Sequence, residues 1–198
     1  MNQLIDYIQI YDDVLSSEDL DLILSESKAS SEWQEARIGS EEGGRENLDM
    51  RKSGLLKITN NYKCHQLLHD KNEMVAEEYC ARFPACRLFM SYGHEVLRYN
   101  TGGFFKIHTD HYAAQPRTMS MIYLLNDDYG GGEISFFMNQ YNIKPKAGSC
   151  VVFPSNFMYP HEIKEVTSGT RYSIVSWSVW RSLTTMSLNL NQPVSEKF

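Results

Sequence analysis

Short strand-like runs separated by turn signals fill this chain from about residue 87 onwards, and they restrict its fold more than any other feature. Apolar and aromatic residues recur in these runs, and clusters of Gly, Pro, Asn and Asp separate them, most clearly at 126–132 and 144–148. The predicted strands span residues 95–99, 104–108, 118–125, 133–137, 149–153, 161–166 and 171–180. Strands at this spacing predict a sandwich, a barrel or a jelly roll.

Helical patterns dominate the part of the chain that precedes these strands. Ser16 can cap a helix, because an acidic residue follows three positions later and an apolar stripe comes after it. A second helix is predicted over about 63–83, and Pro84 ends it. The polar, glycine-rich stretch near 34–54 predicts a flexible loop, which is either a lid or substrate-binding segment or a solvated surface loop.

A chain of 198 residues has the length of a single domain, here 1–198. We expect a helical N-terminal support region over 1–86, a β-rich core over 87–181 and a polar C-terminal tail over 182–198. The predicted fold class is α+β, mainly β, with the N-terminal helices packed on one sheet.

Composition narrows the function classes. Hydrophobic residues make up 42% of the chain, as in an ordinary globular protein, and a net charge of −6 argues against nucleic acid as the main partner. No signal peptide is evident at the N-terminus, and no apolar run approaches the length of a membrane span. The four cysteines form no Cys-x-x-Cys pair, so we expect reduced thiols and a cytoplasmic location.

His108, Asp110, His161 and Arg171 form the candidate site. Two imidazoles and one carboxylate are the ligand set of a facial triad, which holds iron(II) by one face and leaves the other open. Residues i and i+2 of a strand point to the same face, so His108 and Asp110 could share one metal. Arg171 would suit a dicarboxylate co-substrate. The alternative is that three polar residues are simply satisfied by hydrogen bonds within a β-sandwich.

Several segments resemble the iron(II)- and 2-oxoglutarate-dependent dioxygenases, in particular their prolyl 4-hydroxylase-like branch. The similarity covers roughly residues 88–181. Its entry strand is YNTGGFFKIHTD at 99–110, in which Tyr99 precedes the first histidine by nine positions. The other matching segments are 124–128 with 131–133, 152–156 ahead of His161, 170–177, and the earlier Arg-Lys-Ser at 51–53. The resemblance implies a double-stranded β-helix, or jelly roll, as the catalytic core.

Two positions depart from the pattern of that branch. The branch often has a second tyrosine where this chain has Phe105, so a hydroxyl that could contact substrate is missing. Collagen-type members commonly have lysine where Arg171 stands, but the guanidinium offers a bidentate fork to a carboxylate and should preserve co-substrate binding.

The resemblance also implies a role for each site residue. His108, Asp110 and His161 would hold Fe(II), and Arg171 with Tyr99 would bind the distal carboxylate of 2-oxoglutarate. The products would be a hydroxylated C–H carbon, succinate and CO2, with O2 consumed and ascorbate supporting the reaction. Trp177, on the same strand face as Arg171, would wall the pocket. Asp110 argues against the halogenase variant of this site.

Three functions stay open at this point. The resemblance favours hydroxylation of a prolyl residue in a peptide or protein. A 2-oxoglutarate oxygenase could instead act on a free amino acid, a small metabolite or a modified base, although Trp177 stands where repair enzymes of the superfamily usually have a second arginine. The third is a non-catalytic jelly-roll binding module. The short chain is similar to bacterial or viral members, and its oligomeric state is open.

Overall fold

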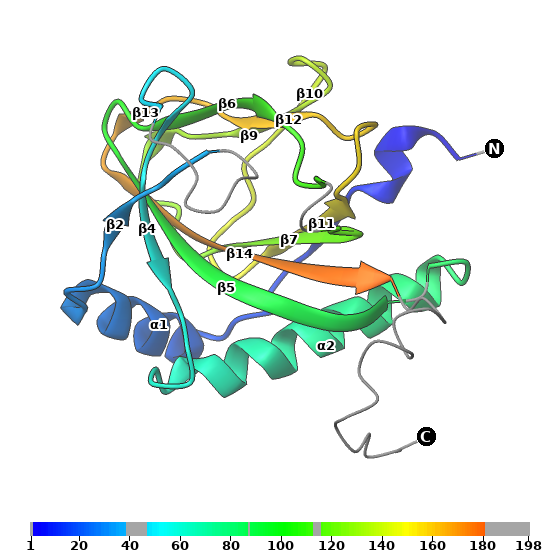
Figure 1. The fold of residues 1–198 in the computed structure, drawn as a ribbon, viewed down its shortest axis with the longest axis horizontal. Coiled ribbons are helices and arrows are strands. Elements are labelled where there is room, and N and C mark those ends of the chain that lie inside the picture. The colour runs from blue at the N-terminus through cyan, green and yellow to red at the C-terminus, as the bar shows by residue number, and fades with distance from the viewer. Residues whose placement is uncertain (1, 39–46, 87, 113–115, 181–198) are drawn as a thin grey trace.

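The computed structural model describes residues 2–38, 47–86, 88–112 and 116–180. Two antiparallel sheets face each other, and two helices lie against the outer face of the larger sheet (Figure 1). This arrangement confirms the predicted jelly roll with N-terminal helices packed on one sheet.

The larger sheet has seven strands, and β14 and β5 form its centre as the longest pair. In spatial order the strands are β1 (Gln9–Tyr11), β11 (Cys150–Pro154), β7 (Met119–Leu124), β14 (Thr170–Trp180), β5 (Leu88–Asn100), β4 (Gly54–Lys57) and β2 (Gln34–Glu35).

The smaller sheet has five strands and carries two of the three candidate metal ligands. Its spatial order is β10 (Tyr141–Ile143), β9 (Ile134–Phe136), β12 (His161–Ile163), β6 (Phe104–His108) and β3 (Arg51–Lys52). A separate two-stranded ribbon pairs β8 (Gly130–Gly131) with β13 (Val166–Ser168).

Both predicted helices are confirmed, as α1 (Ser17–Ala29) and α2 (Cys64–Arg82); a short 3-10 helix, η1 (Leu4–Tyr7), precedes them. Ser16 caps α1 as expected: its Oγ accepts from the Asp19 amide at 3.1 Å, and the Asp19 carboxylate accepts from the Ser16 amide at 2.9 Å. Glu26 of α1 accepts from the first backbone amides of α2, which joins the two helices. None of the helices in the described ranges is long and apolar enough to cross a membrane.

The core has two layers, because the larger sheet buries side chains on both faces. Along β7, Met121 and Tyr123 pack toward the helices, whereas Ile122 and Leu124 pack toward the smaller sheet. This period of two is the strand alternation, so each central strand supplies both layers. The candidate site lies in the layer between the sheets.

The N-terminal region differs from the prediction in one respect. It is not only a helical support, because β1, β2 and β4 extend the larger sheet and β3 extends the smaller one. The stretch 34–54, predicted as a loop, therefore contains strands at both of its ends, while 39–46 lie outside the described residues. The predicted tail at 182–198 also lies outside them. Runs of two or three residues are too short to show alternation in a sequence.

Candidate active site

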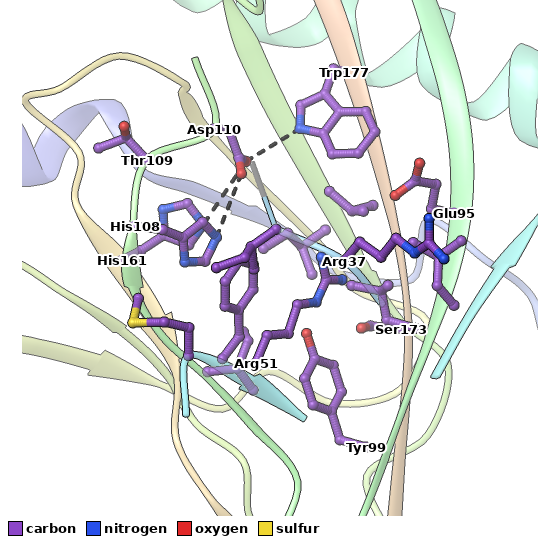
Figure 2. A pocket seen from close by; sticks show the side chains of 18 of the residues that line it. Arg37, Arg51, Glu95, Tyr99, His108, Thr109, Asp110, His161, Ser173 and Trp177 are labelled. Carbon is purple, nitrogen blue, oxygen red and sulfur yellow. Dashed lines mark hydrogen bonds and ion pairs between the residues drawn. The ribbon is translucent and has the colours of Figure 1, made fainter. Parts of the chain in front are cut away.

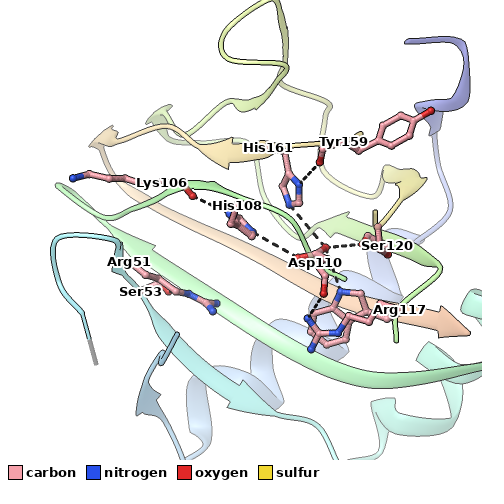
Figure 3. A network of polar contacts seen from close by, with 11 residues as sticks. Arg51, Ser53, Lys106, His108, Asp110, Arg117, Ser120, Tyr159 and His161 are labelled. Carbon is pink, nitrogen blue, oxygen red and sulfur yellow. Dashed lines mark hydrogen bonds and ion pairs between the residues drawn. The ribbon is translucent and has the colours of Figure 1, made fainter. Parts of the chain in front are cut away.

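A cavity of about 750 Å³ opens between the two sheets, and every residue proposed for the site from the sequence lines it. The smaller sheet supplies His108, the last residue of β6, and His161, the first residue of β12. These two residues are register partners on neighbouring strands, so the fold places their imidazoles side by side. Asp110 follows two residues after β6 and turns toward both rings (Figure 3).

The ring nitrogens of both histidines are assigned by their backbone contacts. Nδ1 of His108 donates to the Lys106 carbonyl at 2.8 Å, and Nδ1 of His161 donates to the Tyr159 carbonyl at 3.2 Å. In a neutral ring the lone pair is then on Nε2, and this atom faces the carboxylate: Nε2 of His108 lies 3.6 Å from Asp110 Oδ1, and Nε2 of His161 lies 3.9 Å from Asp110 Oδ2. Second contacts of this kind fix the tautomer of metal-binding histidines.

Asp110 is held by residues of the larger sheet. Its Oδ2 accepts a hydrogen bond from Ser120 Oγ at 2.6 Å and another from Trp177 Nε1 at 3.3 Å. Ser155 Oγ lies 2.7 Å from Ser120 Oγ and extends the network. One carboxylate oxygen is thus engaged by the protein, and Oδ1 is left facing the His108 ring.

The protonation states also suit a cation. Burial, reinforced by the neighbouring His161, lowers the pKa of His108 to about 3, which keeps the imidazole neutral. Burial alone would raise the pKa of Asp110, but the two facing histidines and the Ser120 hydrogen bond outweigh it and lower that pKa. Neutral imidazole and ionised carboxylate are the forms that bind metal ions. These three side chains form the only such cluster among the residues that the structure describes.

Trp177 is positioned by an irregularity in the central strand pair. The register of β14 and β5 shifts between Val175 and Trp177, and Gly93 of β5 has a φ of +69° there. A Cβ at Gly93 would lie 3.1 Å from the Trp177 ring, so any other residue would displace the ring slightly and would also strain the left-handed backbone. The Arg117 guanidinium lies over the same ring, 3.5 Å from its centroid.

Arg171 and Tyr99 form a second polar centre in the cavity. They are register partners on β14 and β5, and both side chains are fully buried. Arg171 Nη1 donates to Ser173 Oγ at 2.6 Å, but Nε and Nη2 of Arg171 and the Tyr99 hydroxyl have no hydrogen-bond partner among the described residues. A buried charge with open donors is costly unless an anion pairs with it. The residues present therefore fit a carboxylate such as the distal one of 2-oxoglutarate.

Phe105, the residue that departs from the expected tyrosine, packs against the candidate metal ligands. Its ring stacks on the His108 ring with centroids 3.5 Å apart, and the Arg51 guanidinium lies over its other face at 4.4 Å. Arg51 Nε also donates to Ser53 Oγ at 3.0 Å. Of the Arg-Lys-Ser segment noted in the sequence, Arg51 thus lines the cavity, and Ser53 holds its guanidinium.

Several residues in or around the cavity were not predicted from the sequence. Arg37 and Glu95 line the wall opposite the triad (Figure 2), and Ser120, Ser155 and Ser173 orient the charged groups. A signal existed for Glu95, because it shares a strand face with Tyr99 at a spacing of four. The serines carried no signal, since their positions depend on strand register.

Comparisons with known proteins agree with this geometry. A family model described as the 2OG-Fe(II) oxygenase superfamily matches residues 94–179. A prolyl hydroxylase from Trichoplax adhaerens, solved with a hypoxia inducible factor peptide fragment, has a TM-score of 0.76 at 18% identity, covering 92% of this chain and 87% of that one. A Pseudomonas putida prolyl-4-hydroxylase has a TM-score of 0.71 at 18% identity, covering 89% and 94%.

Sequence similarity is more local. Prolyl 3-hydroxylase 2 of Mus musculus is 36% identical over 66 residues, which are 31% of this chain and only 9% of that protein. The human protein of the same name matches over the same share of each chain. Residues 94–179 thus match the 2OG-Fe(II) oxygenase superfamily, the chain shares its fold with prolyl hydroxylases, and its His-Asp-His cluster lies in one cavity with a buried arginine.

Proposed function

We propose that this enzyme hydroxylates an unactivated C–H bond of a prolyl residue in a peptide or protein. The observation that carries the proposal is the presence of two centres in one cavity, a His-Asp-His cluster and a buried arginine with open donors. Iron(II), 2-oxoglutarate and O2 would supply the oxidation, with succinate and CO2 as the other products.

Each residue has a role in this proposal. Nε2 of His108, Nε2 of His161 and Oδ1 of Asp110 would hold the iron on one side and leave the opposite side open to the cavity. Arg171 Nη2 and Nε, together with the Tyr99 hydroxyl, would bind the distal carboxylate of 2-oxoglutarate. We also propose that ascorbate supports turnover by keeping the iron reduced.

The prolyl substrate is supported by the relatives. The structural neighbours are named as prolyl hydroxylases, and one was solved with a peptide. The local sequence match is to prolyl 3-hydroxylase 2. A free amino acid, a small metabolite or a modified base is the alternative substrate.

Mass spectrometry of a proline peptide library tests the proposal. The enzyme is incubated with Fe(II), 2-oxoglutarate and ascorbate, beside an Arg171→Met control. A gain of one oxygen on proline that needs both 2-oxoglutarate and Arg171 is the expected result. Succinate formation without any modified peptide would place the substrate outside peptides and favour the alternative.

A further inference from the structure

Glu95 is a carboxylate in the cavity wall that neither the iron site nor the co-substrate site uses. On β5, Glu95, Leu97 and Tyr99 alternate onto the face that lines the cavity, whereas Val96 packs on the helix side. In Figure 2, Glu95 lies across the cavity from His108 and His161.

The register separates Glu95 from the co-substrate anchor. Tyr99 pairs with Arg171, whereas Glu95 pairs with Val175, four residues further along the same strand pair. At about 3.3 Å per residue, the Glu95 Cα lies roughly 13 Å along the strand from that of Tyr99. Glu95 is therefore four positions along the strand pair from the residues that would bind the distal carboxylate.

Neighbouring cations do not neutralise Glu95 by direct contact. The Arg51 guanidinium is held over Phe105, and the Arg117 guanidinium is held over Trp177. No hydrogen bond or ion pair from the described part of the chain reaches the Glu95 carboxylate. Burial raises its pKa, and the charges of Arg51, Arg117 and Lys57 only partly oppose that effect. A half-buried acceptor is thus left facing a cavity in which a substrate would bind.

We propose that Glu95 accepts a hydrogen bond from an N–H group of the primary substrate and thereby selects the substrate and positions it. The inference rests on the proposed function, because it takes the cavity wall around Glu95 to be the part that contacts the molecule that is hydroxylated. The N–H group could come from a protonated side chain or from the neutral backbone amide of a peptide. Both sources share the donor chemistry, and they respond differently to loss of the negative charge.

A binding experiment separates this role from catalysis. The enzyme is loaded with Mn(II) and 2-oxoglutarate, which prevents turnover, and is titrated with short peptides that share a central proline. The residue before proline is lysine in one peptide and norleucine in its match, and a third peptide carries an N-methylated amide. The variants are Glu95→Leu and Glu95→Gln, and the matched control is Glu35→Gln at the exposed rim of the same cavity.

We expect Glu95→Leu to weaken peptide binding roughly 10- to 100-fold, the usual effect of losing one hydrogen bond to a charged group. The affinity for 2-oxoglutarate and the behaviour of Glu35→Gln should stay unchanged. If the donor is cationic, the lysine peptide binds better than the norleucine peptide and Glu95→Gln removes the difference. If the donor is a backbone amide, the lysine and norleucine peptides bind with equal affinity and Glu95→Gln lowers that affinity only slightly. N-methylation of the amide then lowers the affinity as much as Glu95→Leu does.

Three results would overturn the assignment: wild-type affinity in Glu95→Leu, an equal loss of 2-oxoglutarate affinity in that variant, or no peptide binding to the wild type. The proposed function is read separately, from the oxygen gain of the wild type. Peptide hydroxylation that is indifferent to Glu95 would leave the function intact and reject this inference. Peptide binding that depends on Glu95, without any hydroxylation, would support this inference and reject the proposed function.

Discussion

Replacing Arg171 by methionine should abolish co-substrate binding without destabilising the protein. The guanidinium is fully buried and uses one of its donors on Ser173, so Nε and Nη2 remain for a ligand. Two hydrogen bonds to a carboxylate at about 1.5–3 kcal/mol each amount to about 3–6 kcal/mol. This loss corresponds to a roughly 100- to 10,000-fold weaker affinity for 2-oxoglutarate.

Thermal unfolding with Mn(II) measures this effect directly. At 2-oxoglutarate one hundred times above the wild-type Kd, binding adds about 2.7 kcal/mol of stability, which raises Tm by about 5–11 °C in a domain of this size. Under the same conditions Arg171→Met should gain at most about 0.4 kcal/mol, or under about 2 °C. Without ligand its Tm should be equal to or above that of the wild type, because a buried charge lacking a counter-charge has been removed.

The matched control is Arg98→Met. Arg98 is the neighbour of Tyr99 on β5 but lies over the Trp33 ring, 4.4 Å from its centroid, on the other side of the sheet. This variant should keep the full ligand-induced shift. The reasoning is refuted if Arg171→Met retains that shift, or if its ligand-free Tm falls by several degrees, because the guanidinium would then have a structural partner.

Three further substitutions test other parts of the structure. Ser120→Ala removes the 2.6 Å hydrogen bond to Asp110 and should weaken Mn(II) binding about 10- to 100-fold, measured by titration; an unchanged affinity would contradict the orienting role. Burial lowers the pKa of His94 from 6.5 to about 4. As the pH falls, His94 is therefore protonated in the unfolded chain before it is protonated in the folded protein. The contribution of His94 to the free energy of unfolding is thus complete above about pH 6.5, and it is smaller by about 2 kcal/mol at pH 5 and by about 3 kcal/mol below pH 4. Urea unfolding of His94→Gln should lack this pH-dependent contribution. Gly93→Ala should cost about 1–2 kcal/mol from its left-handed backbone and also weaken metal binding by displacing Trp177, and a folded variant with native metal affinity would argue against that link.

The sequence predicted the parts of this molecule that depend on local pattern. Ser16 caps its helix because the capping residues are three positions apart, and β14 was recognisable because apolar and aromatic residues recur along it. The grouping of His108, Asp110, His161 and Arg171 was also predictable, since residue types and strand order were enough to bring them together.

The parts that were missed depend on register between distant segments. Ser120 and Ser155 are 35 residues apart and meet only because β7 and β11 pair with one particular register. The strands β2 and β3 have two residues each and carry no pattern that distinguishes them from a loop. For the same reason a sequence shows that Glu95 is on a strand but not which groups lie opposite it.

The hydrogen bonds to Asp110 tie the two sheets together. Asp110 follows a strand of the smaller sheet, but Ser120 and Trp177, which hold it, belong to β7 and β14 of the larger one. Binding of an ion by Asp110 and the two histidines would therefore be thermodynamically linked to the separation of the sheets. Any fluctuation that separates the two sheets would lower the affinity for the ion, and a bound ion would make such separation rarer. Amide hydrogen exchange between the sheets should consequently slow when the metal is added.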